Sequence, residues 1–323
     1  MIKTYFYNHS ERQMSHDVPI THLDELLRSA DDLLWVDLFN TNRDELNYVG
    51  KMFDFHPLAL EDCLQRSPRA KVDYYGDYYF FVFHALRYDE TQEVEVATTE
   101  LNVFLGSNYV VTIHQEPLAP VGRVADRCRR SYQDMNRGPE YLLYTLVDGI
   151  VDEYFPITDR IAVRIDELED EIYTEATSEV TEEFLALKRT ILLIRRVILP
   201  QRRIFSSING NYSFEVSEEN RPYYGDLADN LDRIIDQTAT FRDLVNGALD
   251  TYYTIVSART NEVMRVLTII STFMLPLTFI TGVFGMNIPI PFHDSLWGWG
   301  MVLGLFTATI LFLLLFFRRR HWL

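Results

Sequence analysis

The sequence contains few cysteines, and they do not occur in a pattern that builds structure. Cys63 and Cys128 are the only two in 323 residues, too few for a disulfide framework and without zinc-site spacing. They fit a reducing compartment such as the cytosol, where cysteine behaves as a small hydrophobic residue. The N-terminal segment MIKTYFYNHS also lacks the apolar stretch of a secretory signal peptide.

The sequence lacks the short motifs of the common enzyme classes. It contains no GxxxxGK[ST] phosphate loop, no glycine-rich dinucleotide fingerprint, no HExxH and no GxSxG. Internal repeats of 20–50 residues and low-complexity tracts are absent as well. We therefore expect that the protein is not an enzyme and that ATP does not power it directly.

Charged residues are scarce in the last fifth of the chain. No Asp, Glu, Lys or Arg occurs from Val266 to His293, or from Ser295 to Phe317. Each run exceeds the roughly 20 apolar residues that cross a bilayer as a helix, so two transmembrane helices are predicted. Residues 261–323 carry four basic and two acidic residues, so the whole-chain charge of −17 leaves −19 on residues 1–260. This acidic part disfavours nucleic acid as a partner.

Basic residues flank the two predicted spans on one side only. Arg265 precedes the first span and Arg318-Arg319-Arg320 follow the second, whereas the loop between them has no Lys or Arg. The positive-inside rule then places both termini in the cytoplasm and the loop at residues 285–295 outside. We expect a multi-pass protein of the plasma membrane, most simply a prokaryotic inner membrane.

Residues 1–135 are predicted to form a cytoplasmic α/β domain. Segments rich in aromatic and β-branched residues predict strands at Ile2–Tyr7, Leu34–Leu38, Tyr78–Tyr88, Val94–Phe104 and Tyr109–His114. Helices are predicted at Thr21–Ala30, Asn42–Phe53 and Pro57–Leu64, with Thr21 and Asn42 as N-caps.

Residues 136–262 are predicted to be helical and acidic. Helical periodicity covers 141–173, and a second helix begins near Thr181 and is interrupted or kinked near Pro200. A third pattern runs from Tyr223 into the first span without a proline before Pro276, which predicts a long stalk helix. With residues 263–323 as the two-span domain, the fold class is an α+β membrane protein.

Two spans are too few to enclose a pathway, so a pore needs several copies around an axis. One face of the first span combines small, polar and apolar residues at helical spacing, which suits hydrated ions and apolar constrictions. Hydroxyls and glycine also serve helix packing in membranes, and Thr268, Thr272 and Thr281 lie on other faces, so both interpretations stay open. The face comprises Asn261, Met264, Leu267, Ser271, Leu275, Thr278 and Gly282.

The first span ends in Gly285-Met286-Asn287. One interpretation is a helix C-terminus with a left-handed glycine. The other is that Asn287 contributes to a ring of amide oxygens at the outer mouth. Such oxygens are hard, neutral acceptors for the water shell of Mg²⁺, which dehydrates reluctantly.

Several motifs together resemble the CorA family of magnesium and divalent cation transporters. They are Thr260-Asn261-Glu262-Val263-Met264, Pro276-Leu277-Thr278-Phe279-Ile280, the Gly285-Met286-Asn287 triplet and the basic end with Trp322-Leu323. In the soluble part, His56-Pro57-Leu58-Ala59-Leu60-Glu61-Asp62 and Tyr141-Leu142-Leu143-Tyr144 are similar to family motifs.

The resemblance implies a homopentamer with a funnel-shaped cytoplasmic domain. It implies that Gly285, Met286 and Asn287 form the selectivity filter and that Asp250 forms a ring lower in the stalk. The family's pore face carries over onto Asn261, Met264, Leu267, Leu275, Thr278 and Gly282. It further implies regulation by Mg²⁺ at carboxylates between subunits, which match Asp62 and Asp226, with Glu61 a weaker neighbour. The transported ion is then chiefly hydrated Mg²⁺, with Co²⁺ or Ni²⁺ possible, driven by the membrane potential.

The outer loop departs from the family pattern, because only Asp294 beside His293 could attract cations there. Imidazole suits transition metals, so a zinc or other transition-metal transporter on the same scaffold is the first alternative. A membrane-anchored sensor that conducts no ions is the alternative from another class.

Overall fold

The computed structural model describes residues 1–19, 21, 23–27, 29–88, 96–174, 177–206, 214, 216–286 and 296–322. The chain divides into two compact units, Met1–Leu249 and Asp250–Leu323. The predicted three-part division at residues 135 and 262 stays a prediction.

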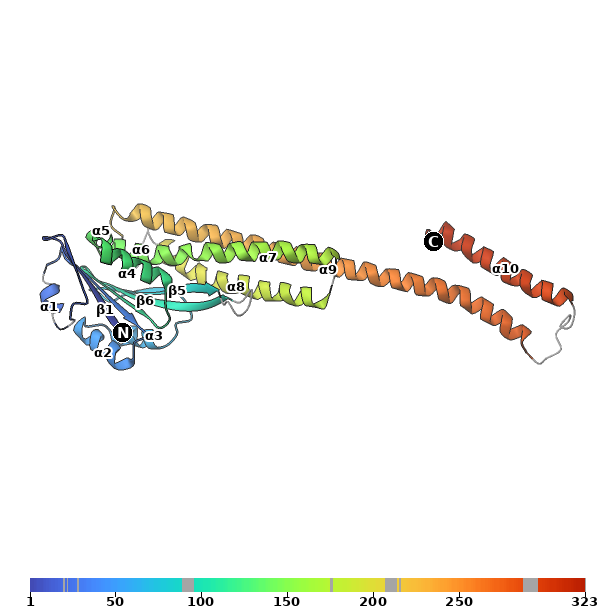
Figure 1. Cartoon of the computed structure of the whole chain (residues 1–323), viewed down its shortest axis with the longest axis horizontal. Helices are drawn as coiled ribbons and strands as arrows, with labels where there is room; N and C mark the ends of the chain where they lie inside the picture. Colours follow the sequence, from blue (N-terminus) through green and yellow to red (C-terminus); the bar gives the residue numbers. More distant parts are fainter. Residues whose placement is uncertain are drawn as a thin grey trace. The chain divides into compact units, whose positions relative to one another are not determined.

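The first unit is built around a seven-stranded sheet (Figure 1) in the order β2-β1-β3-β7-β6-β5-β4. Only the β3–β7 pair is parallel; the other neighbours are antiparallel. The strands are β1 (Ile2–Asn8), β2 (Gln13–His16), β3 (Leu33–Phe39), β4 (Lys71–Tyr74), β5 (Tyr79–Tyr88), β6 (Val96–Leu105) and β7 (Tyr109–His114).

Both faces of this sheet are covered by helices. On one face, α2 (Arg43–Met52) and α3 (Pro57–Leu64) bury an apolar core that includes Val36, Val82 and Phe104. Helices α4 (Ala119–Arg130), α5 (Gln133–Asn136) and α6 (Pro139–Asp152) lie along the other face (Figure 1). Alternate residues of a strand face opposite sides of the sheet, and both sides are covered here. The strands are therefore apolar on both faces.

Local signals set the ends of the first helices. Asn42 caps α2 by accepting from Glu45 N–H at 2.8 Å, and the Glu45 carboxylate accepts from Asn42 N–H at 3.3 Å. This reciprocal capping box confirms Asn42 as the N-cap. Helix α3 begins at Pro57 and ends at Leu64, as predicted, with the His56 ring accepting from Leu58 N–H. The helix predicted at Thr21–Ala30 corresponds to the shorter α1 (Leu23–Leu26).

Three long helices follow. They are α7 (Tyr154–Thr174), α8 (Ser178–Ser206) and α9 (Arg221–Phe284). Helix α8 continues through Pro200, so an interruption there is wrong, while the alternative of a kink stays a prediction. Helix α9 is continuous from the soluble part into the first predicted span, which confirms the long helix.

The second unit contains the remainder of α9 and α10 (Leu296–Arg319), and both are long and apolar enough to cross a membrane. A half-buried stripe on α9, including Ile269, Phe273 and Ile280, faces α10. The rings of Phe273 and Phe317 lie 5.9 Å apart. Most other large side chains here are exposed, with Leu275 at 73%. An exposed apolar surface of this extent is typical of contact with lipid or other subunits.

A buried ion pair links β3 to β7 in the soluble unit. His114 Nε2 lies 3.2 Å from Asp37 Oδ1, and His114 Nδ1 lies 2.7 Å from the Glu116 carbonyl oxygen. Both ring nitrogens face acceptors, which favours the imidazolium form of His114, in which both nitrogens carry a hydrogen. Burial lowers the pKa of His114, but the hydrogen bond and charge of Asp37 raise it by more, and the net pKa is raised.

This pair predicts that folding stability depends on pH. Because the pKa of His114 is raised in the folded state, its contribution is complete below the ordinary histidine pKa and is lost as the pH rises through the raised value. We expect His114→Gln to destabilise the full-length protein by about 1 kcal/mol at low pH and by less at high pH. Thermal unfolding in detergent at about pH 6 and about pH 8 measures this. His9→Gln, at an exposed position, is the control; equal pH slopes for wild type and His114→Gln contradict the assignment.

Candidate functional site

The predicted regulatory carboxylates of α3 differ in their surroundings. Glu61 is exposed and accepts a hydrogen bond from Gln65 Nε2 at 2.9 Å. Asp62 is half-buried and lies 2.7 Å from the ammonium of Lys71, at the start of β4. Lys71 also lies 2.7 Å from Asp73. Within one chain, therefore, Asp62 already has a cationic partner, which it shares with Asp73.

The charge of Lys71 is firmly held. Burial lowers its pKa, but the hydrogen bonds to Asp62 and Asp73 raise it by more, so the net pKa is raised. A cation that binds Asp62 must compete with this ammonium, which can remain paired with Asp73. Lys71 was not among the predicted site residues, because its nine-residue separation from Asp62 crosses a loop whose path no local pattern predicts.

Asp226 lies exposed in the first turns of α9, beside further carboxylates of α6. Burial, followed by the negative charges of Asp152 and Asp226, raises the pKa of Asp148 to about 6. The raised pKa of Asp148 therefore reports repulsion among neighbouring carboxylates. Asp148 and Asp152 were not predicted from the sequence, although their four-residue spacing puts both on one side of a predicted helix.

The start of α9 is fixed to the start of α6 by Glu140. One oxygen of its carboxylate accepts from Ser217 N–H at 3.1 Å, Ser217 Oγ at 2.6 Å and Asn220 Nδ2 at 3.0 Å. Tyr224 donates to the Glu140 carbonyl oxygen at 2.8 Å. These contacts determine where Asp226 lies relative to Asp148.

Aromatic residues of the same helices enclose Arg137. Its guanidinium lies 3.7 Å from the centre of the Tyr141 ring and 4.5 Å from that of Tyr223. Tyr144 contacts Tyr223 and Tyr224. The Tyr141–Tyr144 motif thus joins α6 to α9 next to the carboxylates.

Among the residues that the structure describes, no group of three or more His, Cys, Asp or Glu side chains could hold a metal ion. The pairing of Asp62 with Asp226 across a subunit boundary stays a prediction.

All residues of the predicted pore face, together with Asp250, are exposed. They lie off the half-buried stripe that faces α10, so this face of α9 is left uncovered within the unit. By contrast, the hydroxyls of Thr268, Thr272 and Thr281 donate to backbone carbonyls of α9 itself. Exposure alone does not separate a pore surface from a lipid surface, because Met274 and Phe279 are exposed as well.

Helix α9 ends just before the triplet. Gly285 N–H donates to the Thr281 carbonyl oxygen at 2.8 Å. Among the described residues, the glycines with positive φ are Gly76 and Gly138, so the left-handed interpretation of Gly285 is wrong. Instead, a Cβ at Gly285 would lie 2.9 Å from the Thr281 oxygen, a close approach that requires glycine. Asn287, His293 and Asp294 lie outside the described residues.

The fold and these residues define a class: a membrane protein in which a soluble α/β domain leads through one long helix to two apolar helices. Residues 30–319 match the family described as CorA-like Mg²⁺ transporter protein. The chain belongs to this family, whose members are membrane transporters of divalent cations.

Individual relatives match over nearly the whole chain. The cobalt/magnesium transport protein CorA of Thermotoga maritima is 34% identical, covering 92% of this chain and 85% of the relative. The protein of the same name from Methanocaldococcus jannaschii is 25% identical over 93% of this chain and 95% of its own length. In a structural comparison, the complete CorA magnesium transporter structure from M. jannaschii covers 100% of this chain and 99% of its own, with a TM-score of 0.85 and 22% identity. That likeness concerns the fold.

Proposed function

We propose that the protein forms a homopentameric channel that conducts hydrated Mg²⁺ into the cell. Gly285, Met286 and Asn287 form the outer selectivity filter, and the pore face of α9 lines the pathway. Both termini lie in the cytoplasm, and residues 285–295 lie on the outer side. An inside-negative potential contributes about 2.3 kcal/mol per charge per 100 mV, hence about twice that for a divalent ion, so no nucleotide is needed.

The continuity of α9 supports this proposal more than any other single observation. One uninterrupted helix, Arg221–Phe284, carries Asp226, Asp250 and the whole predicted pore face, and ends at the triplet. Four exposed carboxylates on it, Asp229, Asp236, Asp243 and Asp250, recur at intervals of seven. Counted on from Asp250, the same interval passes Ser257 and reaches Met264, Ser271 and Thr278. In a symmetric assembly, one helical line then leads from acidic residues to the pore face.

Cytoplasmic Mg²⁺ is proposed to control the pore through Asp62 and Asp226 of adjacent copies. Bound Mg²⁺ would remove the repulsion between carboxylates that meet at the boundary. Without it, the carboxylates near Asp226 repel, and the subunits separate at this level. The ion can favour the closed state only as far as it binds that state more tightly.

Flux into liposomes tests the proposed function. We expect purified full-length protein to admit Mg²⁺ at a rate that rises with an inside-negative potential set by a K⁺ gradient. The name of the T. maritima relative supports Co²⁺ as a second transported ion. Selective Zn²⁺ flux would instead favour the transition-metal alternative, and no flux of any divalent ion would favour a non-conducting sensor.

A further inference from the structure

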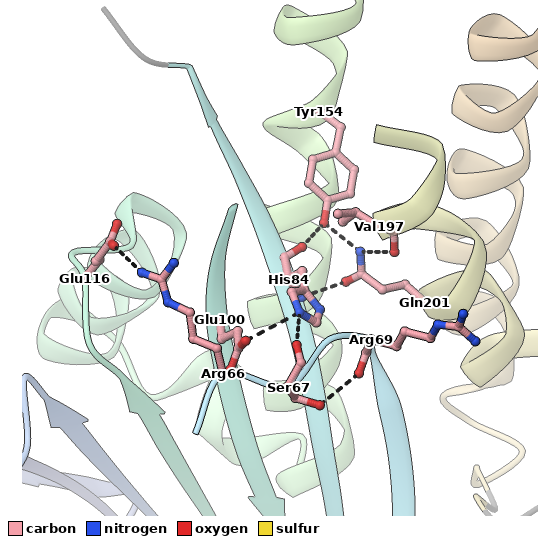
Figure 2. Close-up of polar contacts among 9 residues, drawn as sticks. All are labelled: Arg66, Ser67, Arg69, His84, Glu100, Glu116, Tyr154, Val197 and Gln201. Atoms are coloured by element: carbon pink, nitrogen blue, oxygen red, sulfur yellow. Dashed lines mark hydrogen bonds and ion pairs between the residues drawn. The ribbon is translucent and has the colours of Figure 1, made fainter. Parts of the chain in front are cut away.

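At His84, strand β5 extends beyond its neighbour β4. The two strands pair only from Lys71↔Val82 to Tyr74↔Tyr79, so His84 has no partner residue on β4. Side chains of two helices form hydrogen bonds with its backbone instead (Figure 2). Gln201 Oε1 accepts from His84 N–H at 3.3 Å, and the Tyr154 hydroxyl donates to the His84 carbonyl oxygen. Helices α8 and α7 therefore satisfy the backbone where β4 ends.

Gln201 and Tyr154 act together. Gln201 Nε2 donates to the Tyr154 hydroxyl at 2.9 Å and to the Val197 carbonyl oxygen at 3.3 Å. Tyr154 is 0% exposed and Gln201 is 1% exposed. Leaving any of these groups unpaired in such a buried place is costly, so the network holds both helices in one position against β5.

The ring of His84 makes a separate connection, to the loop between α3 and β4. Its Nε2 lies 2.9 Å from the Ser67 carbonyl oxygen and 3.6 Å from the Glu100 carboxylate (Figure 2). Both are acceptors, so Nε2 carries the hydrogen and donates to Ser67. His84 Nδ1 is buried and, among the residues that the structure describes, has no hydrogen-bond partner. The ring is therefore fixed on one side only, by the loop and Glu100.

The loop so held belongs to the segment that carries the regulatory carboxylate. Ser67 lies between Asp62 and Lys71, and the ion pair of these two residues closes the segment. A second link from this loop joins Arg66 to Glu116, just after β7, at 3.3 Å, and its arginine side chain is 80% exposed. Exposed pairs contribute little, so the part-buried His84–Ser67 bond, made by a buried histidine ring, is the stronger restraint.

We propose that His84 is a positioning residue that couples the Asp62 segment to the α7–α8 helices. The inference rests on the proposed function, in which Asp62 helps to bind regulatory Mg²⁺. Ser67 cannot shift without breaking a part-buried hydrogen bond to His84, whose backbone is held by side chains of two helices. The segment is thereby kept in the position that binds Mg²⁺, and weakening this restraint lowers the affinity of the sensor while leaving the pore intact.

Two substitutions at His84 separate hydrogen bonding from packing. His84→Leu removes the donor, whereas His84→Gln keeps an amide that can donate to Ser67. In liposomes, we expect His84→Leu to raise the Mg²⁺ concentration for half-maximal inhibition about fivefold, the change that losing one hydrogen bond produces. Flux without inhibitory Mg²⁺ is unchanged, and His84→Gln restores most of the inhibition. Tyr7→Phe removes a hydrogen bond to Asn136, 2.6 Å long, elsewhere in the unit, and leaves inhibition unchanged.

Hydrogen exchange of residues 65–70 in Mg²⁺-free protein tests the restraint independently of the sensor. We expect exchange to be about fivefold faster in His84→Leu than in wild type, with His84→Gln close to wild type. If Asp62→Ala leaves inhibition unchanged, the sensor assignment fails while this exchange result still decides the role of His84. The proposal is overturned if His84→Leu shows the exchange and the inhibition of the wild type. It is also overturned if Tyr7→Phe changes both as much as His84→Leu does. His84→Asn, with a shorter amide, replaces His84→Leu if the latter does not fold.

Discussion

Replacing Asn287 with alanine is expected to reduce Mg²⁺ flux at least about tenfold. In the proposed filter, each subunit presents one amide oxygen to the water shell of the ion. A hydrogen bond to a charged group contributes about 1.5–3 kcal/mol, and each 1.4 kcal/mol corresponds to a factor of about ten. Loss of all copies in an oligomer therefore removes a large part of the affinity at the mouth. Radiotracer or fluorescent-dye flux into liposomes, at a fixed membrane potential, measures the change.

The matched control is Asn47→Ala, which makes the same substitution at an exposed position of α2. It should conduct as the wild type does. Gly285→Ala is expected to impair flux as well, since its Cβ would lie 2.9 Å from the Thr281 carbonyl oxygen. Wild-type Mg²⁺ flux in Asn287→Ala, with normal insertion, would show that the triplet only terminates α9.

Much of the fold follows from local sequence signals. β7 at Tyr109–His114 and α3 at Pro57–Leu64 have the bounds that were predicted. In both, the boundary is set by neighbouring residues: a continuous apolar run for β7, and Pro57 at the first helical position for α3. The two apolar helices were equally predictable, because an uncharged apolar run of this length is typical of a helix that crosses a bilayer.

The strands that escaped prediction are β2 and β4, of four residues each. Both lie at the edges of the sheet and have polar sequences, QMSH and KVDY, with little buried surface. An edge strand is specified mainly by the strand it pairs with, which a local pattern does not contain. The uninterrupted helix at Pro200 has a similar cause, since burial of neighbours such as Val197 and Ile204 outweighs the loss of one helix bond.

The residues of the candidate site could be predicted only where they belong to a family motif. Asp62 and Asp226 were identified by resemblance, but their surroundings come from residues distant in the chain. Lys71 pairs with Asp62, and Asp148 lies within the electrostatic influence of Asp226. Glu140 reaches Ser217 across 77 positions. Such juxtapositions arise from tertiary packing, which no periodicity or short spacing encodes.

Substituting both of the proposed regulatory carboxylates is expected to abolish the proposed inhibition by Mg²⁺. In Asp62→Ala with Asp226→Ala, the two oxygen donors proposed to bridge adjacent subunits are gone, and the remaining acidic residues cannot reproduce the pair. We expect flux to stay high at Mg²⁺ concentrations that reduce wild-type flux about tenfold or more, since a coupling of about 1–3 kcal/mol corresponds to about 5–150-fold. Flux into liposomes with Mg²⁺ preset inside measures the response.

Lys71→Gln provides a variant with the opposite expected sign. It removes the ammonium that lies 2.7 Å from Asp62 while keeping a side chain of similar length. Asp62 is then free to bind a cation, so we expect inhibition at a lower Mg²⁺ concentration than in wild type. The double variant and Lys71→Gln are therefore expected to change the response to Mg²⁺ in opposite directions from that of the wild type. If the double variant stays inhibited as the wild type is, Asp62 and Asp226 are not the sensor. If the double variant responds as expected but Lys71→Gln does not shift the response, the ion binds without displacing the Lys71 ammonium from Asp62. That ammonium then does not move to Asp73.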